Sequence, residues 1–461
     1  MGMNLARALR LTKTLIPNLK SEIENPKSTI AIVGSGGKTT ALSLLAHQLA
    51  PSVATTTTHL GLWQLTEADR HITLPEDAIP SNNPLQLASG VTLVTSLVDG
   101  DRLKGLNNRL VYWLHEISQS SNIPMLIEAD GSRQKPLKAP AAHEPVIPPF
   151  ANLVLVVAGM SGLGKPLLKD HIHRPEIFAS LSDLEIGQEV TAQAIVRVLT
   201  HPNGGLKGIP AGARKVAILN QADSPDLQSI GGKMAKELLA VFDTVLVGSL
   251  LPENLHTFEP IAGIVLAAGE AKRFGKPKQL LEWRGKPLAR QVAETALGAG
   301  LSPVVIVTGA YAQEVEAAVR DLPVEIVHNG AWQSGQASSI RAGLETIAPL
   351  SSSTSWKKAV GAAIFLLADQ PQVLPMVLRA LVEHHRENLA PIIAPQVKGQ
   401  RANPVLFDCT TFPELMVLSG EAGGRAVFSK FPITYMPWHD ESLLLDVDTP
   451  QDFARLQELT I

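Results

Sequence analysis

Residues 261–279 join a small-residue turn to a cluster of cations, an arrangement suited to phosphate chemistry. An apolar run ends at Gly269, where the missing Cβ lets a ligand approach the backbone closely. Four basic residues follow within seven positions, Lys272, Arg273, Lys276 and Lys278. Backbone amides beside cations suit a nucleoside triphosphate. The alternative is an ordinary strand-to-helix turn with a solvated basic face.

Carboxylates in the same half of the chain predict a magnesium site. The apolar run 362–368 delivers Asp369 to the end of a predicted strand. Mg²⁺ usually binds through one or two carboxylates together with substrate phosphates, so Asp369 is the predicted metal ligand. Two further carboxylates, Asp446 and Asp448, occur near the end of the sequence. Asp448 also begins Asp-Thr-Pro, a good helix start, so a capping role is the alternative.

Residues 329–343 form a third candidate element in this half. The segment begins as a turn and ends as a helix N-terminus, with Gly335 permitting close approach. Ser338 and Ser339 offer hydroxyls to a base or a phosphate. A capped helix without a ligand is the alternative.

The first half of the chain contains a second predicted phosphate loop. Residues 28–33 are expected to form a strand that runs into Gly-Ser-Gly-Gly-Lys-Thr-Thr and then a helix. The spacing is the short G-x-x-G-K-[ST], as in the ATP loop of the Mur ligases. Backbone N–H groups would hold phosphates, Lys38 would bridge their outer oxygens, and Thr39 would bind Mg²⁺. A purely structural turn is the alternative. The predicted nucleotide contacts are Gly34, Gly36, Gly37, Lys38, Thr39 and Thr40.

Further polar residues are expected near this loop. The apolar strand 124–127 ends in Glu128 and Asp130, where Asp130 is predicted to bind Mg²⁺ or to orient a water, unless the segment is a surface turn. Residues 55–58 supply four threonine hydroxyls, which an ordinary β-branched strand would also explain. A group just beyond the carboxylates is interpreted as an anion or metal pocket or as solvated side chains: Lys135, Lys138, His143 and Glu144.

The segment Asn220-Gln-Ala-Asp223 is similar to the guanine-reading N-K-x-D of GTPases, with Gln221 in place of Lys. A carboxylate has only acceptors, so Asp223 would accept from both guanine N–H donors. A plain loop is the alternative, and both ATP and GTP stay open for this site.

The pattern of elements predicts an α/β fold in two domains. After 261 the expected order is strand 263–268, helix 286–299, strand 303–308, helix 311–320 and strand 324–328. Such alternation predicts a mainly parallel, doubly wound, Rossmann-like sheet with ligands at the carboxyl ends of its strands. The first domain is predicted to be P-loop-like, and residues 1–27 to be an amphipathic helix and a linker. Residues 248–260 lack periodicity, so the domains are placed at 1–255 and 256–461.

Composition excludes several functional classes. The net charge of -3 and an aromatic content of 4% argue against nucleic acid as a partner. A single cysteine, Cys409, rules out an intramolecular disulfide and fits a reducing cytoplasm. No apolar run reaches membrane-spanning length and the N-terminus lacks a signal peptide, so the expected location is cytoplasmic.

The second half resembles a known family. Leu266-Ala-Ala-Gly-x-x-x-Arg273-Phe-Gly275-x-x-Lys278 is similar to the signature LAAGxSxRxGxxK of the nucleotidyltransferases that mature molybdopterin cofactors, with Ala271 where the family usually has Ser. The resemblance implies attack of a molybdopterin phosphate on the α-phosphate of CTP, giving the cytosine dinucleotide and pyrophosphate. Arg273 and Lys278 would then neutralise the triphosphate, and Asp369 would bind Mg²⁺. Residues 444–452 resemble the family's closing D-x-D-T-P-x-D, which implies that Asp446 or Asp448 completes the metal site.

The same resemblance addresses the choice of base. In this family Leu-Ala-Ala-Gly goes with CTP and Leu-Ala-Gly-Gly with GTP, so Ala268 favours cytidine. The implied nucleotide contacts in this half are Leu266, Ala267, Ala268, Gly269, Gly275, Ser338 and Ser339.

The first half, over residues 28 to 250, resembles the selenium-dependent hydroxylase accessory family (YqeC-like). The similarity rests on the loop at 33–40, on 55–58, on Glu128-Ala-Asp-Gly-Ser-Arg133, and on the segments at 135–140 and 143–148. It implies an NTP-binding accessory domain in the maturation of molybdenum hydroxylases of the xanthine dehydrogenase type. Two rivals stay open: a sugar- or polyol-phosphate nucleotidyltransferase, and a GTPase-like chaperone that inserts the cofactor.

Overall fold

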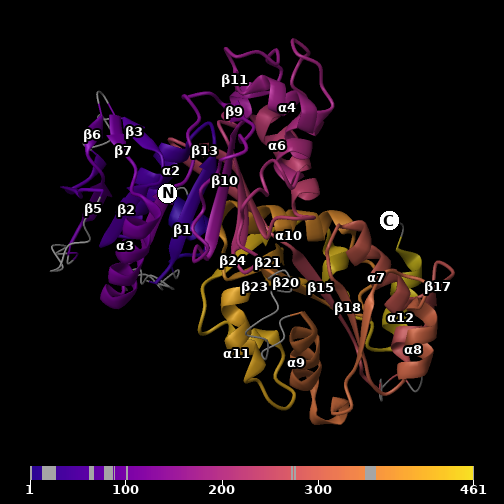
Figure 1. The fold of residues 1–461 in the computed structure, drawn as a ribbon. Coiled ribbons are helices and arrows are strands. Elements are labelled where there is room, and N and C mark those ends of the chain that lie inside the picture. The colour runs from indigo at the N-terminus through magenta and orange to yellow at the C-terminus, as the bar shows by residue number, and fades with distance from the viewer. Residues whose placement is uncertain are drawn as a thin grey trace. The chain divides into compact units, whose positions relative to one another are not determined.

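The computed structural model describes residues 3–12, 27–61, 67–76, 87, 89–99, 102–270, 274, 277–347 and 360–459. The chain divides into two compact units, Met1–Phe258 and Glu259–Ile461 (Figure 1). Each is an α/β unit built on a large sheet, so the predicted two-domain α/β class is confirmed, while the P-loop-like assignment of the first domain stays a prediction. Within the described residues, no helix combines the length and the apolar character needed to cross a membrane.

The first unit is built on a nine-stranded sheet of order β14-β13-β12-β10-β1-β8-β2-β5-β4. Neighbouring strands pair in parallel, except that β13 and β14 are antiparallel. The carboxyl ends of the parallel strands therefore lie at one end of the sheet, where ligands of such folds bind. The strands are β1 (Thr29–Gly34), β2 (Ser52–Thr56), β4 (Arg70–Thr73), β5 (Val91–Thr95), β8 (Met125–Glu128), β10 (Leu153–Gly159), β12 (Arg214–Asn220), β13 (Thr244–Leu250) and β14 (Glu253–Phe258).

Smaller elements surround this sheet. Two short strands, β9 (Leu137–Lys138) and β11 (Ile172–His173), pair in parallel, and β3 (His59–Gly61), β7 (Arg102–Lys104) and β6 (Val98–Asp99) form a three-stranded sheet. The helix after β1 packs on β1, β2 and β8. The helices are α1 (Leu5–Ala8), α2 (Lys38–Gln48), α3 (Asn108–Ser121), α4 (Pro175–Ser182), α5 (Ala192–Thr200) and α6 (Pro225–Leu238).

Two predictions about this unit need revision. Residues 248–260 were predicted to be irregular, but most of them belong to β13 and β14, which pair from Val245 with Phe258 to Leu250 with Glu253. The predicted N-terminal helix is limited to α1, because Leu9 caps it, and residues 13–26 lie outside the described part of the chain.

The second unit contains a sheet of order β19-β18-β15-β20-β23-β21-β22, with β24 paired to β21. The first four strands are parallel, whereas β23 is antiparallel to β20 and to β21. The strands predicted near 263–268, 303–308 and 324–328 are confirmed as β15, β18 and β19. The strands are β15 (Ile261–Ala267), β18 (Val304–Thr308), β19 (Glu325–His328), β20 (Ala362–Leu367), β21 (Ile392–Val397), β22 (Gln400–Arg401), β23 (Val405–Asp408) and β24 (Ile433–Pro437).

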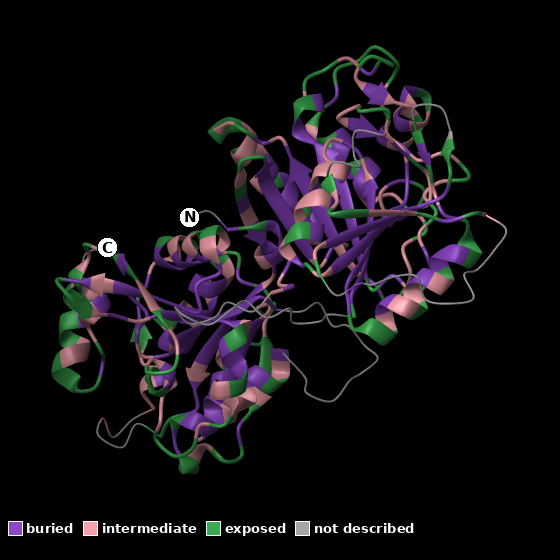
Figure 2. Cartoon of the chain, turned by 90° about the vertical axis from the view of Figure 1, so that its left-hand side faces the viewer, coloured by how far each residue is buried: buried purple, intermediate pink, exposed green. Residues whose placement is uncertain are grey.

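Helices cover both faces of this sheet, and the sequence of β15 explains why. Val265 and Ala267 join the core beneath one group of helices, while Ala262 and Ile264 join the core on the opposite face. A strand buried on both faces must be apolar throughout, as this one is. Figure 2 shows the strands buried along their length and the helices partly exposed. The helices are α7 (Leu288–Gly298), α8 (Ala312–Val319) and α10 (Pro375–Asn388) on the first face, α9 (Gln336–Ile347) and α11 (Phe412–Met416) on the second, and α12 (Pro450–Glu458) near the C-terminus.

Candidate functional sites

Residues 34–37 form a tight loop between β1 and α2, and its glycines are required by close backbone contacts. Gly34 has a φ of +97°, and a Cβ there would lie 2.1 Å from the Val157 carbonyl oxygen. Gly37 has a φ of +137° and lies against the side chain of Asn220. α2 begins at Lys38, so the unpaired N–H groups of its first turn lie at this loop, as in anion sites at helix N-termini.

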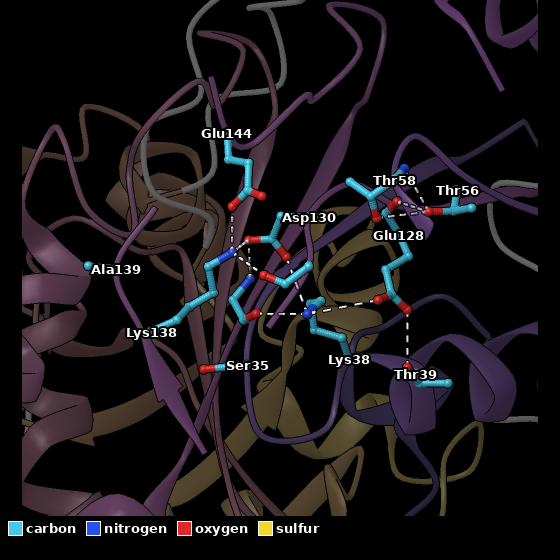
Figure 3. Close-up of polar contacts among 12 residues, drawn as sticks. Ser35, Lys38, Thr39, Thr56, Thr58, Glu128, Asp130, Lys138, Ala139 and Glu144 are labelled. Atoms are coloured by element: carbon cyan, nitrogen blue, oxygen red, sulfur yellow. Dashed lines mark hydrogen bonds and ion pairs between the residues drawn. The ribbon is translucent and has the colours of Figure 1, made fainter. Parts of the chain in front are cut away.

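Lys38 is buried beside the carboxylates that end β8 (Figure 3). Its ammonium donates to the Gly34 carbonyl at 2.9 Å and lies 3.3 Å from Asp130 and 3.8 Å from Glu128. Thr39 donates its hydroxyl proton to Glu128 at 3.1 Å. Parallel pairing of β1 with β8 brings the loop and the carboxylates together, because both lie at the carboxyl ends of adjacent strands.

Asp130 holds the loop instead of facing the open cleft. It is 2% exposed, accepts from the Gly34 N–H at 3.1 Å, and lies 2.7 Å from the Lys138 ammonium. Both hydrogen bonds reach Oδ2, whereas Oδ1 accepts none and lies 3.3 Å from the Lys38 ammonium, so the metal-ligand role of Asp130 stays a prediction. Glu128 lines the cleft and is the carboxylate better placed beside Thr39. Burial raises the pKa of Glu128, and the Lys38 ammonium opposes that rise.

The charge network continues from Asp130 through Lys138 to Glu144 (Figure 3). Lys138 lies 3.1 Å from Glu144, which also accepts two hydrogen bonds from Arg174, at 2.7 and 3.1 Å. Burial alone would raise the pKa of Glu144, but the hydrogen bond from Arg174 and the charge of Lys138 lower it to about 2. Sequence reasoning grouped Lys138 with Glu144 but missed the Arg174 pair, which comes from a segment 30 positions away.

A large cleft of about 1230 Å³ opens over this loop. Its lining includes Gly36, Gly37, Lys38, Thr39 and Thr40. It also includes Asn220, the last residue of β12, and Asp223, which follows that strand. The predicted loop residues thus line one cleft, apart from Gly34, which lines a separate, smaller cavity.

Asn220 supports the loop with both ends of its amide. The Nδ2 group donates to the Gly36 carbonyl at 2.7 Å, and the Oδ1 atom accepts from the Leu250 N–H at 2.9 Å. Asp223 is exposed at the rim of the cleft. The predicted threonine row is mostly used by the fold, since Thr55 donates to the Val94 carbonyl and Thr56 to the Glu128 carbonyl, and Thr58 lines the cleft.

The second unit has its candidate site at the carboxyl ends of β15 and β20. The Lys278 ammonium lies 3.0 Å from Asp369 and 2.8 Å from Asp448, and it donates to the Val447 carbonyl at 2.9 Å. Burial would lower the pKa of Lys278, but the charges of Asp369 and Asp448 raise it overall. Two carboxylates therefore converge on one cationic centre. Asp446 instead accepts a hydrogen bond from Gln370.

A cleft of about 680 Å³ lies above this group. Leu266, Ala267, Ala268 and Gly269 line it together with Lys278, Asp369 and Ser339. A Cβ built on Gly269 meets nothing within 4 Å, so packing does not explain why this residue lacks a side chain. Arg273 and Gly275, which were predicted to bind the triphosphate, lie outside the described residues, as do Lys272 and Lys276.

The serine segment is used differently from the expectation. The Ser338 hydroxyl contacts the carbonyls of Ala331 and Gly335 and accepts from the Asn329 side chain, so it fixes its own loop. Ser339 also accepts from Asn329, at 3.0 Å, but it borders the cleft. Gly335 has a φ of +106° and approaches the backbone of Gly420, not open space.

Glutamines that sequence reasoning missed brace this site. Gln279 donates to the Gly269 carbonyl at 3.0 Å and thereby supports the turn that follows β15. Gln370 lies just beyond the end of β20 and donates a hydrogen bond to Asp446. Their positions directly after Lys278 and Asp369 were the signal available in the sequence. Among the residues that the structure describes, no cluster of three or more His, Cys, Asp or Glu side chains forms a protein-only metal site.

Two family models match the two halves of the chain. The YqeC protein family matches residues 30–176, and the MobA-like NTP transferase domain matches residues 263–435. The chain thus belongs to both families: its first unit is YqeC-like and its second is a MobA-like nucleotidyltransferase domain.

Two curated proteins each match one half of the chain. YqeC of Escherichia coli (strain K12) is 31% identical over 202 residues, which are 42% of this chain and 76% of that protein. Nicotine blue oxidoreductase of Paenarthrobacter nicotinovorans is 35% identical over 206 residues, which are 42% of this chain and 96% of that protein. The crystal structure of Rv0371c from Mycobacterium tuberculosis H37Rv is 29% identical, covers 43% of this chain and 98% of that one, and has a TM-score of 0.38.

Proposed function

We propose that the chain is a molybdenum cofactor cytidylyltransferase, which transfers CMP from CTP to molybdopterin phosphate and releases pyrophosphate. The observation that carries the proposal is the convergence of Asp369 and Asp448 on one cation, Lys278, beneath the turn at Gly269. Nucleotidyl transfer depends chiefly on positioning and on charge neutralisation, and this group supplies both.

Each residue has a defined task in this proposal. Lys278, with Arg273, neutralises charge on the triphosphate, and Ala268 favours cytosine. The open space at Gly269 lets the phosphates approach the backbone. Asp369 and Asp448 are a suitable oxygen donor set for Mg²⁺, because both carboxylates already face one cationic centre. When bound there, Mg²⁺ would neutralise phosphate charge.

The first unit is proposed to bind ATP or GTP on the loop at 34–40 and to serve the maturation of a molybdenum hydroxylase of the xanthine dehydrogenase type in the cytoplasm. Thr39 and Glu128 are the residues that would hold its Mg²⁺, since they are hydrogen-bonded to each other at the cleft.

The decisive assay follows pyrophosphate release by the full chain with Mg²⁺, molybdopterin and either CTP or GTP. We expect release with CTP, loss of release in Lys278→Ala, and retention in Lys38→Ala, because Lys38 belongs to the other unit. Failure of the wild-type protein to release pyrophosphate with molybdopterin would overturn the proposal.

The same assay distinguishes the alternatives. A sugar- or polyol-phosphate nucleotidyltransferase would release pyrophosphate with a sugar phosphate and not with molybdopterin. A GTPase-like insertion chaperone would hydrolyse GTP in a manner that depends on Lys38 but not on Lys278. Similarity to nicotine blue oxidoreductase adds a redox alternative, which would appear as oxidation or reduction of nicotine blue without pyrophosphate release.

A further inference from the structure

The cleft of the first unit has a basic wall beyond its phosphate loop. We use the term basic wall for Arg133, Lys135, Lys169 and Arg174, all of which line the cleft. Six basic and four acidic side chains line the cleft altogether. At about 1230 Å³, it exceeds the roughly 300–1,000 Å³ typical of a site for one small ligand. A nucleotide on the loop therefore leaves part of the cleft available.

The fold joins the two segments that carry the basic wall. Leu137 pairs with Ile172 and Lys138 with His173 in the short parallel strands β9 and β11. The Lys135 ammonium also donates to the Asp170 carbonyl at 2.8 Å. Residues 133–135 precede β9, whereas 169 precedes β11 and 174 follows it, so the four cations flank one rigid pair of strands.

The basic wall is attached directly to the phosphate loop. The Ser35 hydroxyl donates to the Pro136 carbonyl at 3.0 Å, and the Gly159 N–H donates to the same oxygen at 2.8 Å. A Cβ on Gly36 would lie 2.7 Å from that oxygen as well. Pro136 directly follows Lys135. A residue of the basic wall is therefore bonded covalently to the residue that contacts the loop proposed to hold a nucleotide.

Charge is left over on this wall. Glu144 offsets the charges of Arg174 and Lys138, and Glu176 lies 3.3 Å from Lys169. In the part of the chain that the structure describes, Arg133 has no hydrogen-bond or ion-pair partner. Arg133 also has a φ of +51°, an uncommon conformation for a residue with a side chain and one that concentrates at binding sites.

The neighbouring histidine reports the same positive field. His173 ends β11 and lines the cleft. Burial and then the charges of Arg174, Lys138 and Arg133 lower the pKa of this histidine to about 4, although the charge of Glu144 acts in the opposite direction. An anion at the basic wall would relieve this repulsion.

We propose that the basic wall binds the phosphate group of a second small-molecule ligand, next to the nucleoside triphosphate on the 34–40 loop. The proposal rests on the nucleotide site proposed for the first unit and extends it to a site for two ligands. Arginine and lysine are the side chains that recognise phosphate, and Arg133 has its donors free to do so. The ligand class is a phosphorylated small molecule.

The experiment uses calorimetry on the full chain, with the loop saturated by a non-hydrolysable GTP analogue and inorganic phosphate as the titrant. We expect one phosphate site per chain. Arg133→Ala and Lys135→Ala should each lower the affinity for phosphate roughly tenfold, because each removes a charged hydrogen-bond donor. The affinity for the GTP analogue should change less than about twofold. Lys233→Ala, an exposed cation on α6 away from the cleft lining, is the matched control and should change neither affinity.

Several outcomes would overturn the inference. They are the absence of phosphate binding, unchanged phosphate binding in the Arg133 and Lys135 variants, an equal loss of nucleotide affinity in them, or binding of succinate in preference to phosphate. Lys38→Ala separates this inference from the proposed nucleotide site. It should abolish binding of the analogue while the Arg133-dependent phosphate site persists.

Discussion

The Lys278 ammonium lies 3.0 Å from the Asp369 carboxylate, although the two residues are 91 positions apart. β15 and β20 pair in parallel from Ile261 with Ala362 to Leu266 with Leu367, so their carboxyl ends deliver both segments to one place. Asp448 reaches the same ammonium from the segment before α12. The pairing of β15 with β20 therefore brings Lys278 and Asp369 together, at the place where the proposed function puts the triphosphate and its metal.

Removing either carboxylate should impair catalysis through the metal. We expect Asp369→Asn to lower kcat/KM for CTP roughly a hundredfold, because an electrostatic group at the reacting phosphates is lost. Asp448→Asn should have a smaller effect, since its side chain is 55% exposed against 27% for Asp369. Both variants should need more Mg²⁺ for half-maximal rate in a magnesium titration. Glu282→Gln, exposed on β16 (Glu282–Trp283), is the control, and a wild-type magnesium requirement in both Asp variants would contradict this role.

Two glycines of the same cleft should respond in opposite ways to alanine. Gly269→Ala should leave the thermal unfolding midpoint unchanged, because the new methyl group meets nothing within 4 Å. The same substitution should nevertheless lower the affinity for CTP. Gly335→Ala should destabilise the fold by about 1–3 kcal/mol, since its φ is +106° and the Gly420 backbone lies 2.3 Å from the new atom. Thermal melts with and without CTP measure both effects. Wild-type CTP affinity in Gly269→Ala would argue against phosphate approach at this turn.

Asn220 and Asp223 should separate loop support from base recognition. Asn220→Ala removes the hydrogen bonds to Gly36 and Leu250, so it should lower the affinities for ATP and for GTP by the same factor. Asp223→Asn should lower the affinity for GTP and leave that for ATP unchanged if the exposed carboxylate accepts hydrogen bonds from the guanine N–H groups. Titration of each variant with fluorescent ATP and GTP analogues measures both ratios. A base-dependent effect of Asn220→Ala would show that its amide does more than brace the loop.

Glu144 should make the stability of the first unit depend on pH in the acidic range. Its pKa falls to about 2 in the folded chain, whereas an unpaired glutamate titrates near 4.5. The ionised carboxylate therefore contributes stability above about pH 4.5, and this contribution is lost as the pH falls toward 2. Glu144→Gln should have a lower urea midpoint than the wild type at pH 6, and the difference should narrow between pH 4.5 and 2.5. A difference that stays constant with pH would contradict this assignment.

Local sequence predicted the two strand–turn–helix elements because their signals are contiguous. The glycines at 34–37, the basic residue at 38 and the apolar run before them all act within one short segment. The same holds for the run that ends at Asp369, and its strand lies where it was predicted.

The contacts that depend on distant segments could not be predicted in this way. The Ser338 hydroxyl was predicted to contact a base or a phosphate. In the structure it donates to the Ala331 carbonyl and accepts from the Asn329 side chain. Asp130 likewise accepts hydrogen bonds from the Gly34 N–H and the Lys138 ammonium, and only the folded sheet brings these groups together. Residues 248–260 contain two prolines and a mixed polar pattern, and they become strand because β13 provides a pairing partner.

Mass spectrometry of the pterin product tests the central claim most directly. The full chain is incubated with CTP, Mg²⁺ and molybdopterin, with Lys278→Ala as the parallel sample. The proposal predicts a product heavier by one CMP unit in the wild-type sample, equimolar pyrophosphate, and no such product in the variant. Unmodified molybdopterin in the wild-type sample, or the same adduct in both samples, would contradict it.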